Sequence, residues 1–316
     1  MAKYYFGNKK VVVHYSNYFI AEVIINRKRG GDMYSNFLRF PGGRSRAVTF
    51  SYDDGPREDL RLAEIFDSCG MKGTFNLNSA NVGKPGRLTA EEIQTHLLDK
   101  GHEIAVHGAN HRAPGKLRPI EGITEVLRCR EELERTFGII VRGMAYPNSG
   151  IRHFSPGVSY EQVKRYLTEL DIAYARTLAG DNDRFFLPED WHAWMPSAHH
   201  DNPEIFSYID RFLALTPEKR TGDNGMPRLF YVWGHSFEFA NRNNWDRIEA
   251  ICEKLGGCDD VWYATNGEIH DYVEACKALI RSADGAIVFN PTLRDVYMTV
   301  DDRPVLIRSG ETVRLD

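Results

Sequence analysis

Short apolar segments alternate with amphipathic helical segments along most of this chain. Apolar and β-branched runs predict strands near residues 47–51, 73–77, 103–106, 172–176, 229–233 and 261–264, with another leading up to Tyr146. Between them, apolar residues three and four positions apart predict helices, as with Leu62, Ile65 and Phe66. Further helices are predicted near residues 120–137, 160–169, 203–215, 245–255 and 267–280. Strands that alternate with helices form βαβ units around a parallel sheet, and six or seven such units predict a distorted (β/α) barrel.

The pattern changes at both ends of the chain. After about residue 282, short strands near 286–289, 296–300 and 304–307 are separated by turn residues, which predicts a small antiparallel appendage. Residues 1–46 are also β-rich and precede the repeating units. We therefore expect three parts: a β-rich segment packed on the barrel (1–46), the barrel (47–281) and a β appendage (282–316).

Composition excludes several classes of protein. The 316 residues are 42% hydrophobic and 27% charged, as in an ordinary globular protein. A net charge of -4, with one short basic cluster at Arg27–Arg29, argues against a nucleic-acid partner. No apolar run approaches the roughly 18 residues of a membrane span, and the N-terminus lacks the pattern of a signal peptide. We therefore expect a cytoplasmic protein without a membrane partner, while oligomeric state is left open.

Cysteine usage gives no sign of a disulfide or zinc framework. The five cysteines are odd in number and show no CxxC spacing. Reduced thiols are the expectation.

Two adjacent carboxylates follow the first barrel strand. Asp53 and Asp54 lie in a turn-forming segment at the carboxyl end of that strand, where parallel α/β barrels build their active sites. One carboxylate can bind a metal while the other accepts a proton from the metal's water. Most acidic pairs lie in plain turns, which is the prediction for Asp301–Asp302, so it is the preceding apolar strand that makes Asp53–Asp54 a catalytic candidate.

Two histidines follow the third predicted strand. His107 and His111, four positions apart, can face one metal if the chain curls into a turn. The nearby His102–Glu103 resembles the start of a zincin motif, but His107 lies five positions after His102, which excludes that motif. Two incidental histidines are the alternative. Together with Asp54, the pair makes a recognised catalytic ligand set that leaves positions open for water.

Two later strand ends offer further catalytic groups. The turn at Tyr146–Pro147 can aim a backbone N–H at a developing oxyanion, although a structural loop is the usual meaning of such a turn. His235 follows the strand at 229–233 and could donate a proton to a leaving group, although a lone histidine there is more often structural.

The order of these elements resembles the polysaccharide deacetylase family, also called the NodB-homology domain or carbohydrate esterase family 4. The resemblance extends over roughly residues 45–280, and its most specific parts are Asp-Asp-Gly and His-x-x-x-His. It implies a distorted barrel of about seven strands and one divalent metal, usually zinc and sometimes cobalt or nickel. The implied roles are a general base (Asp53), three metal ligands (Asp54, His107 and His111), an oxyanion donor (the Tyr146 N–H) and a general acid (His235).

The chain departs from the family pattern in two places. The arginine that should precede the Tyr–Pro turn is missing, and Arg176, after the fifth strand, is the candidate replacement for orienting Asp53. The family's Asp–Trp motif matches Asp190–Trp191 only loosely, and these residues and His200 are weak candidates for substrate contacts. Core packing is an equal alternative for Trp191.

The resemblance implies a hydrolase acting on carbon–nitrogen bonds other than peptide bonds. The expected substrate is an acetylated carbohydrate of the N-acetylglucosamine type, from which acetate is released. An O-acetyl esterase acting on xylan or another acetylated glycan is the alternative within the hydrolases. A catalytically inactive carbohydrate-binding barrel is the alternative from another class. The chain contains no GxSxG, Walker A or GxGxxG motif.

Overall fold

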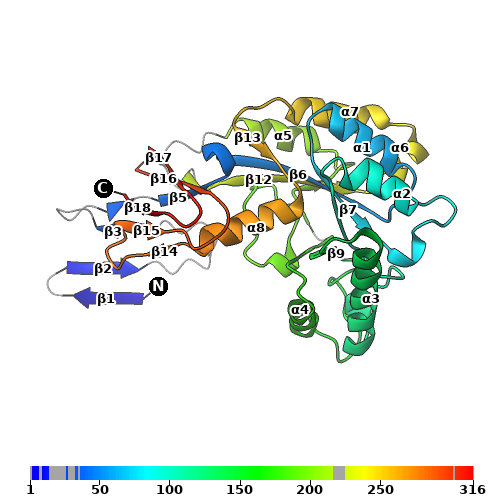
Figure 1. Ribbon diagram of the computed structural model, residues 1–316, viewed down its shortest axis with the longest axis horizontal. Coiled ribbons are helices and arrows are strands. Elements are labelled where there is room, and N and C mark those ends of the chain that lie inside the picture. Colours follow the sequence, from blue (N-terminus) through cyan, green and yellow to red (C-terminus); the bar gives the residue numbers. More distant parts are fainter. Residues whose placement is uncertain are drawn as a thin grey trace.

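Seven parallel strands form the centre of the molecule (Figure 1). The structure is a computed structural model that describes residues 37–178, 180–215, 225–301 and 303–315 in full, together with the backbone of residues 2–6, 9–13, 26–27, 33–34 and 36. The strand order is β10-β9-β8-β7-β6-β12-β11. These strands are β6 (Arg46–Asp53), β7 (Gly73–Leu77), β8 (Glu103–Val106), β9 (Gly143–Ala145), β10 (Tyr174–Arg176), β11 (Ala198–His199) and β12 (Arg228–Gly234).

The sheet curls until its two edges meet a common segment. At one edge, Arg176 of β10 forms a parallel bridge with Trp194. A few residues later the same segment becomes β11, which pairs with β12 at the other edge. An eighth strand, β13 (Val261–Tyr263), pairs with the first half of β6. This arrangement confirms the predicted distorted (β/α) barrel of about seven strands.

Helices cover the outer face of the barrel (Figure 1). They are α1 (Asp59–Ser68), α2 (Ala90–Ile93), α3 (Pro119–Phe137), α4 (Tyr160–Glu169), α5 (Ile205–Leu213), α6 (Phe237–Arg242) and α7 (Trp245–Leu255). Another helix, α8 (Asn266–Lys277), begins instead at the inner face, where its Asn266 contacts Thr49 of β6. A π-helical turn, Gln94–Leu98, continues α2, and 3-10 turns occupy Pro41–Gly43, Ser79–Asn81, Pro114–Lys116 and Trp191–Ala193.

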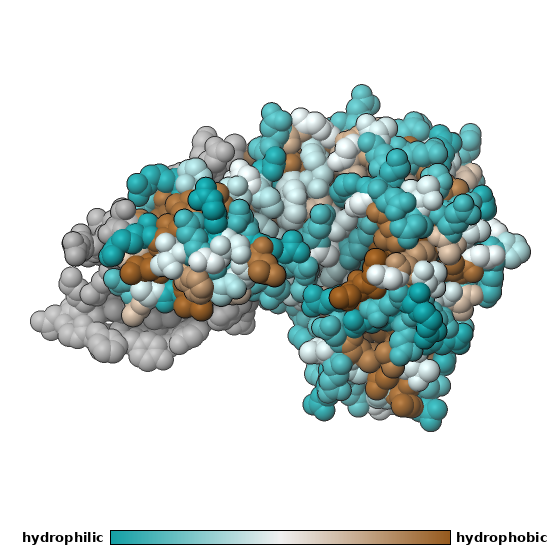
Figure 2. All heavy atoms as spheres, in the orientation of Figure 1, coloured by the Kyte–Doolittle hydropathy of each residue, from teal (hydrophilic) through white to brown (hydrophobic). Residues whose placement is uncertain are grey.

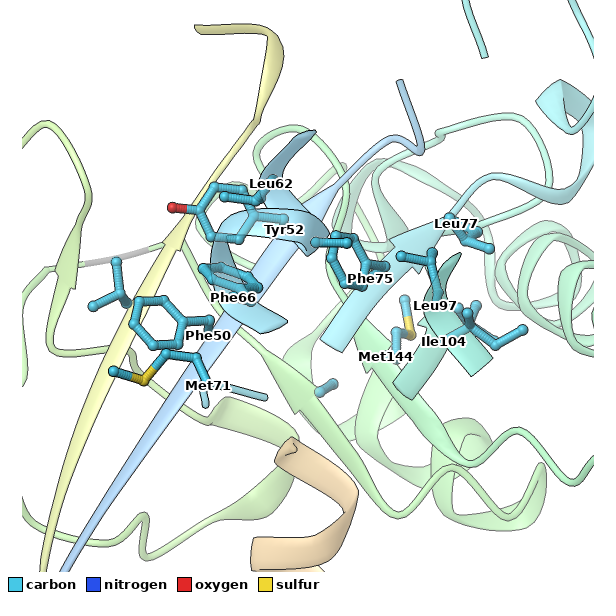
Figure 3. Packing of buried hydrophobic residues seen from close by; sticks show 14 of the residues in the cluster. Phe50, Tyr52, Leu62, Phe66, Met71, Phe75, Leu77, Leu97, Ile104 and Met144 are labelled. Atoms are coloured by element: carbon cyan, nitrogen blue, oxygen red, sulfur yellow. The ribbon is translucent and has the colours of Figure 1, made fainter. Parts of the chain in front are cut away.

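The alternation of side chains along β6 separates an apolar face from a polar one. Phe50 points outward and packs on Phe66 of α1, with ring centroids 4.7 Å apart (Figure 3). Thr49 donates instead to Asn266 Oδ1 at 2.9 Å, on the opposite face of the strand. Because successive side chains in a strand point to opposite faces, Asp53 shares the face of Thr49. The first carboxylate of the acidic pair therefore lies inside the barrel mouth.

Antiparallel strands form the end of the molecule away from α1, α2 and α3 (Figure 1). These strands confirm the predicted β-rich C-terminal appendage, and β5, from the N-terminal segment, pairs with β16 of the appendage. They are β5 (Asn36–Arg39), β14 (Ile280–Arg281), β15 (Ile287–Phe289), β16 (Val296–Val300), β17 (Arg303–Ile307) and β18 (Thr312–Arg314). Shorter pairings join β1 (Ala2–Phe6) with β2 (Lys9–Val13) and β3 (Asn26–Arg27) with β4 (Met33–Tyr34).

The surface seen in Figure 2 is largely hydrophilic, with separate apolar islands. Across the described residues, no helix combines the length and apolar character needed to span a bilayer.

Candidate functional site

Asp53 is a buried carboxylate held by two donors. Its Oδ1 accepts hydrogen bonds from Asn76 Nδ2 at 2.9 Å and from Arg176 Nη2 at 2.6 Å, and the same Nη2 also contacts Oδ2. Burial by itself would raise the pKa of Asp53, but the charges of Arg176, His107 and His235 and the hydrogen bond from Arg176 together hold that pKa below its ordinary value. Asp53 is therefore ionised and fixed in orientation.

Arg176 makes the contact with Asp53 that the resemblance assigns to the missing arginine before the Tyr–Pro turn. It comes from β10, is fully buried, and packs its guanidinium 4.5 Å from the centroid of the Trp233 ring. Arg142, the arginine nearest to the Tyr–Pro turn in sequence, faces Asp171 and Asp271 at 3.7 and 3.6 Å instead. The contact between Arg176 and Asp53 thus joins residues 123 positions apart.

Asp54 leaves the strand in a conformation that turns its carboxylate toward the two histidines. Its backbone has φ of 79° and its N–H donates to Asn76 O at 3.0 Å, while Arg87 Nη1 donates to its carbonyl at 2.8 Å. The carboxylate Oδ1 then lies 3.3 Å from His111 Nε2 and 3.6 Å from His107 Nε2.

The loop that carries the two histidines is wrapped around a buried glutamate. Glu125 of α3 accepts hydrogen bonds from the backbone N–H groups of Asn110 at 2.5 Å and Arg112 at 3.3 Å. Gly108 has φ of 75°, and a Cβ there would lie 3.1 Å from Glu125 Oε1, so this tight approach favours glycine. The curl brings His107 and His111 together, with ring centroids 4.9 Å apart.

Hydrogen bonds to the two histidines orient their rings for a cation. His107 Nδ1 lies 2.9 Å from the carbonyl oxygen of Ala145, which fixes the proton on Nδ1 and leaves the Nε2 lone pair facing Asp54. Burial lowers the pKa of His107, so the ring is neutral. His111 is held through its carbonyl oxygen, which accepts from Asn148 Nδ2 at 2.6 Å.

The three ligand candidates fit a divalent metal. Their ligand atoms lie within 4.8 Å of one another. Ligands about 2.0–2.1 Å from a tetrahedral ion lie about 3.3 Å apart, close to the 3.3 and 3.6 Å found between Asp54 and the two histidines. A carboxylate with two neutral imidazoles is also a donor set suited to such an ion.

His235 lies between two carboxylates. Its Nε2 is 4.0 Å from Asp53 Oδ2, and its Nδ1 is 3.7 Å from Glu238 Oε2. Burial by itself would lower the pKa of His235, but these two carboxylates favour the imidazolium and raise the pKa above its ordinary value. The ring is therefore well placed to carry a proton.

Tyr146 is not available as the oxyanion donor, which corrects the prediction made from sequence. Its backbone N–H continues the parallel ladder between β9 and β10 and donates to Arg176 O at 3.0 Å. Two residues later, the Asn148 backbone N–H has no acceptor among the described residues, and the Asn148 side chain touches His111. Asn148 is the better-placed donor.

Asp190 and Trp191 are engaged away from these groups. Asp190 accepts from Lys164 Nζ at 2.7 Å and Tyr160 Oη at 2.6 Å. Trp191 lies in a buried cluster and donates from Nε1 to Glu274 Oε1 at 2.6 Å. Trp191 is therefore a core residue, whereas Asp190 lines a cavity together with Phe186, Met195 and Met226.

Some residues that shape the site were missed from sequence. Asn76, Glu125 and Glu238 were not singled out, although Asn76 occupies an inward position of a predicted strand. His200 is fully buried and faces Glu238 at 3.2 Å rather than the metal ligands.

Comparisons with known proteins give a matching family model and similar folds. The family model described as polysaccharide deacetylase matches residues 41–164. The fold is similar to a Mycobacterium smegmatis protein assigned to the polysaccharide deacetylases, with 18% identity and a TM-score of 0.55 over 78% of this chain and 96% of that one. A Pseudomonas aeruginosa protein of the same assignment gives 15% identity and a TM-score of 0.54 over 73% of this chain and 92% of that one.

Other comparisons are weaker. The match to the Streptococcus pyogenes deacetylase PplD, at 16% identity and a TM-score of 0.37, covers 42% of this chain and spans 55% of that protein's length. No curated protein matches the chain. The family match over residues 41–164 includes both aspartates and both histidines of the site, and it agrees with the resemblance that the motifs indicate.

Proposed function

We propose that this protein is a metal-dependent deacetylase that hydrolyses N-acetyl groups of an N-acetylglucosamine-type oligosaccharide or polysaccharide. One observation carries the proposal: Asp54, His107 and His111 converge beside an ionised Asp53 and a proton-carrying His235. The family match supports acetyl hydrolysis as the reaction class.

The proposed metal ligands are Asp54, His107 and His111, with zinc as the favoured ion. When bound, such an ion supplies Lewis acidity, polarising the acetyl carbonyl and lowering the pKa of water. Asp53 Oδ2 faces this site, 3.9 Å from His107 Nε2, and accepts the proton of the attacking water. Arg176 keeps that carboxylate ionised and oriented.

Two further groups complete the reaction. The Asn148 backbone N–H stabilises the negative charge that develops on the acetyl oxygen. His235 donates its proton to the departing nitrogen as the carbon–nitrogen bond breaks. Water and the N-acetyl group thus yield acetate and a free amine on the sugar.

The test is acetate release from N-acetylglucosamine oligomers by the zinc-loaded protein. Asp53→Asn should lower kcat by about a hundredfold or more while zinc content is unchanged, because proton transfer of this kind contributes about 10²–10⁴-fold. Asp54→Ala should lose activity together with the zinc ion held by Asp54, His107 and His111. Asp259→Asn alters an exposed acidic pair and is the matched control, which should keep both.

The same assay separates the alternatives. Release of acetate from acetylated xylan but not from N-acetylglucosamine oligomers would identify an O-acetyl esterase. Zinc binding and glycan binding with no turnover of either substrate would identify a carbohydrate-binding barrel and refute the proposed deacetylase.

A further inference from the structure

A second group of metal-binding side chains lies at the same end of the barrel, beside β11 and β12. His200 and Asp201 directly follow β11, and Glu238 lies in α6 just after β12. His200 Nε2 is 3.2 Å from Glu238 Oε2 and 3.3 Å from Asp201 Oδ2. The group shares no residue with Asp54, His107 and His111.

His200 is a buried imidazole without a hydrogen-bond partner. Its side chain is fully buried, and neither ring nitrogen makes a hydrogen bond. The ring is held by stacking on Tyr52, with centroids 5.7 Å apart and planes 7° apart, and by Phe239, 4.1 Å away. Buried polar groups almost always have a hydrogen-bond partner or bind an ion or water. The unpaired Nε2, which faces the two carboxylates, therefore indicates that a ligand binds between them.

The spacing within this group is that of ligands around an ion. His200 Nε2 makes no hydrogen bond, so its approaches of 3.2 and 3.3 Å to the two carboxylates are not hydrogen bonds. Ligands of a tetrahedral ion lie about 3.3 Å apart, and the separation between Asp54 and His111 at the first site, 3.3 Å, is the same.

We propose that His200, Asp201 and Glu238 bind a second divalent transition-metal cation, with Zn²⁺ as the probe. His199, although near, is outside the ligand set. The Asp201 backbone N–H donates to His199 Nδ1 at 3.1 Å, which leaves the ring proton on Nε2. That Nε2 lies 3.1 Å from Glu238 Oε2, where its proton supports the carboxylate instead of binding the ion.

Arg242 is the side chain with which the cation competes. Its Nη1 contacts Asp201 Oδ2, and its Nη2 lies 3.9 Å from Glu238 Oε1. The side chain is 51% exposed and can turn into solvent when the cation binds. Arg247 also lies near the group, with its Nε 3.7 Å from Asp201 Oδ1. Its N–H groups are already donated to backbone carbonyls, Nε to His200 O and Nη2 to Asn202 O, both at 2.8 Å.

The second cation would lie next to the proposed general acid. Glu238 Oε2 is 3.7 Å from His235 Nδ1, so an ion on Glu238 would fix the turn that carries His235. The test counts metal ions, and its outcome is therefore independent of the proposed deacetylase activity.

The experiment measures zinc per chain after the chelator-stripped full-length protein is equilibrated with buffered Zn²⁺. The wild type should bind two ions, His200→Gln one and His111→Gln one, and the double variant none. His199→Gln is the matched control and should keep two. Glu238→Gln repeats the test without changing the buried ring, in case His200→Gln does not fold.

A gain of affinity gives a readout that misfolding cannot imitate. Arg242→Gln removes the competing charge and should tighten the second zinc by about threefold, the scale of a half-exposed ion pair. The proposal is overturned if the wild type binds one zinc that only His111→Gln removes. It is also overturned if His200→Gln, Glu238→Gln and Arg242→Gln leave zinc binding unchanged.

Discussion

Replacing Arg176 with methionine should destabilise the protein strongly, because it leaves Asp53 buried without its counter-charge. Both side chains are at most 2% exposed, and their closest nitrogen–oxygen contacts are hydrogen bonds to both carboxylate oxygens. Removing one partner of such a buried pair costs about 3–5 kcal/mol. Loss of the packing on Trp233, 4.5 Å away, adds to that cost. This is a large part of the roughly 5–15 kcal/mol by which a domain is stable.

A double-mutant cycle tests whether the pair acts as a unit. Urea unfolding at pH 8 in excess chelator, which removes metal binding from the balance, gives the free energy of unfolding for wild type, Arg176→Met, Asp53→Asn and the double variant. Each single variant leaves one buried charge alone, whereas the double variant leaves none. The double variant should therefore be more stable than the sum of the single losses predicts, by about 2 kcal/mol or more. Additive losses within about 0.5 kcal/mol would refute the reasoning.

Two further predictions concern stability away from the site. Burial lowers the pKa of His102 to about 4 in the folded protein. Between about pH 6.5 and pH 4 this histidine is therefore protonated in the unfolded chain but neutral in the folded one, so stability falls as pH falls through that window. At pH 5 the free energy of unfolding should be about 2 kcal/mol lower than at pH 8 because of this group. Thermal unfolding of wild type and His102→Gln should therefore give a stability difference that changes with pH. A difference that does not depend on pH would contradict the prediction. Gly122→Ala in α3 should destabilise by about 1–3 kcal/mol despite the better helix propensity of alanine, because its Cβ would lie 2.6 Å from the hydroxyl of buried Tyr166. Thr124→Ala, on the exposed side of the same helix, is the control, and chemical denaturation should show its free energy of unfolding unchanged or raised. If Gly122→Ala also leaves the free energy of unfolding unchanged, Tyr166 can move aside and the reasoning is wrong.

The sequence by itself determined the elements and the local part of the site. The strands at residues 73–77 and 103–106 and the helices at 160–169 and 245–255 have the bounds that their apolar patterns predicted. A capping box between Thr89 and Glu92, residues three positions apart, begins α2. These features depend on side-chain periodicity and on hydrogen bonds between near neighbours, so they are readable from the chain. The same is true of the acidic pair at the end of β6 and of the spacing from His107 to His111.

Only the tertiary structure decided which groups meet across the barrel mouth. Arg176 reaches Asp53 because sheet order brings the end of β10 into the barrel opposite β6, a relation that no local pattern contains. Parallel pairing of β9 with β10 also occupies the Tyr146 N–H, so the assignment of that N–H to the oxyanion was wrong although the turn itself is present. The physical reason is that hydrogen-bond partners between strands follow from register and barrel closure, which are set by packing of the whole chain.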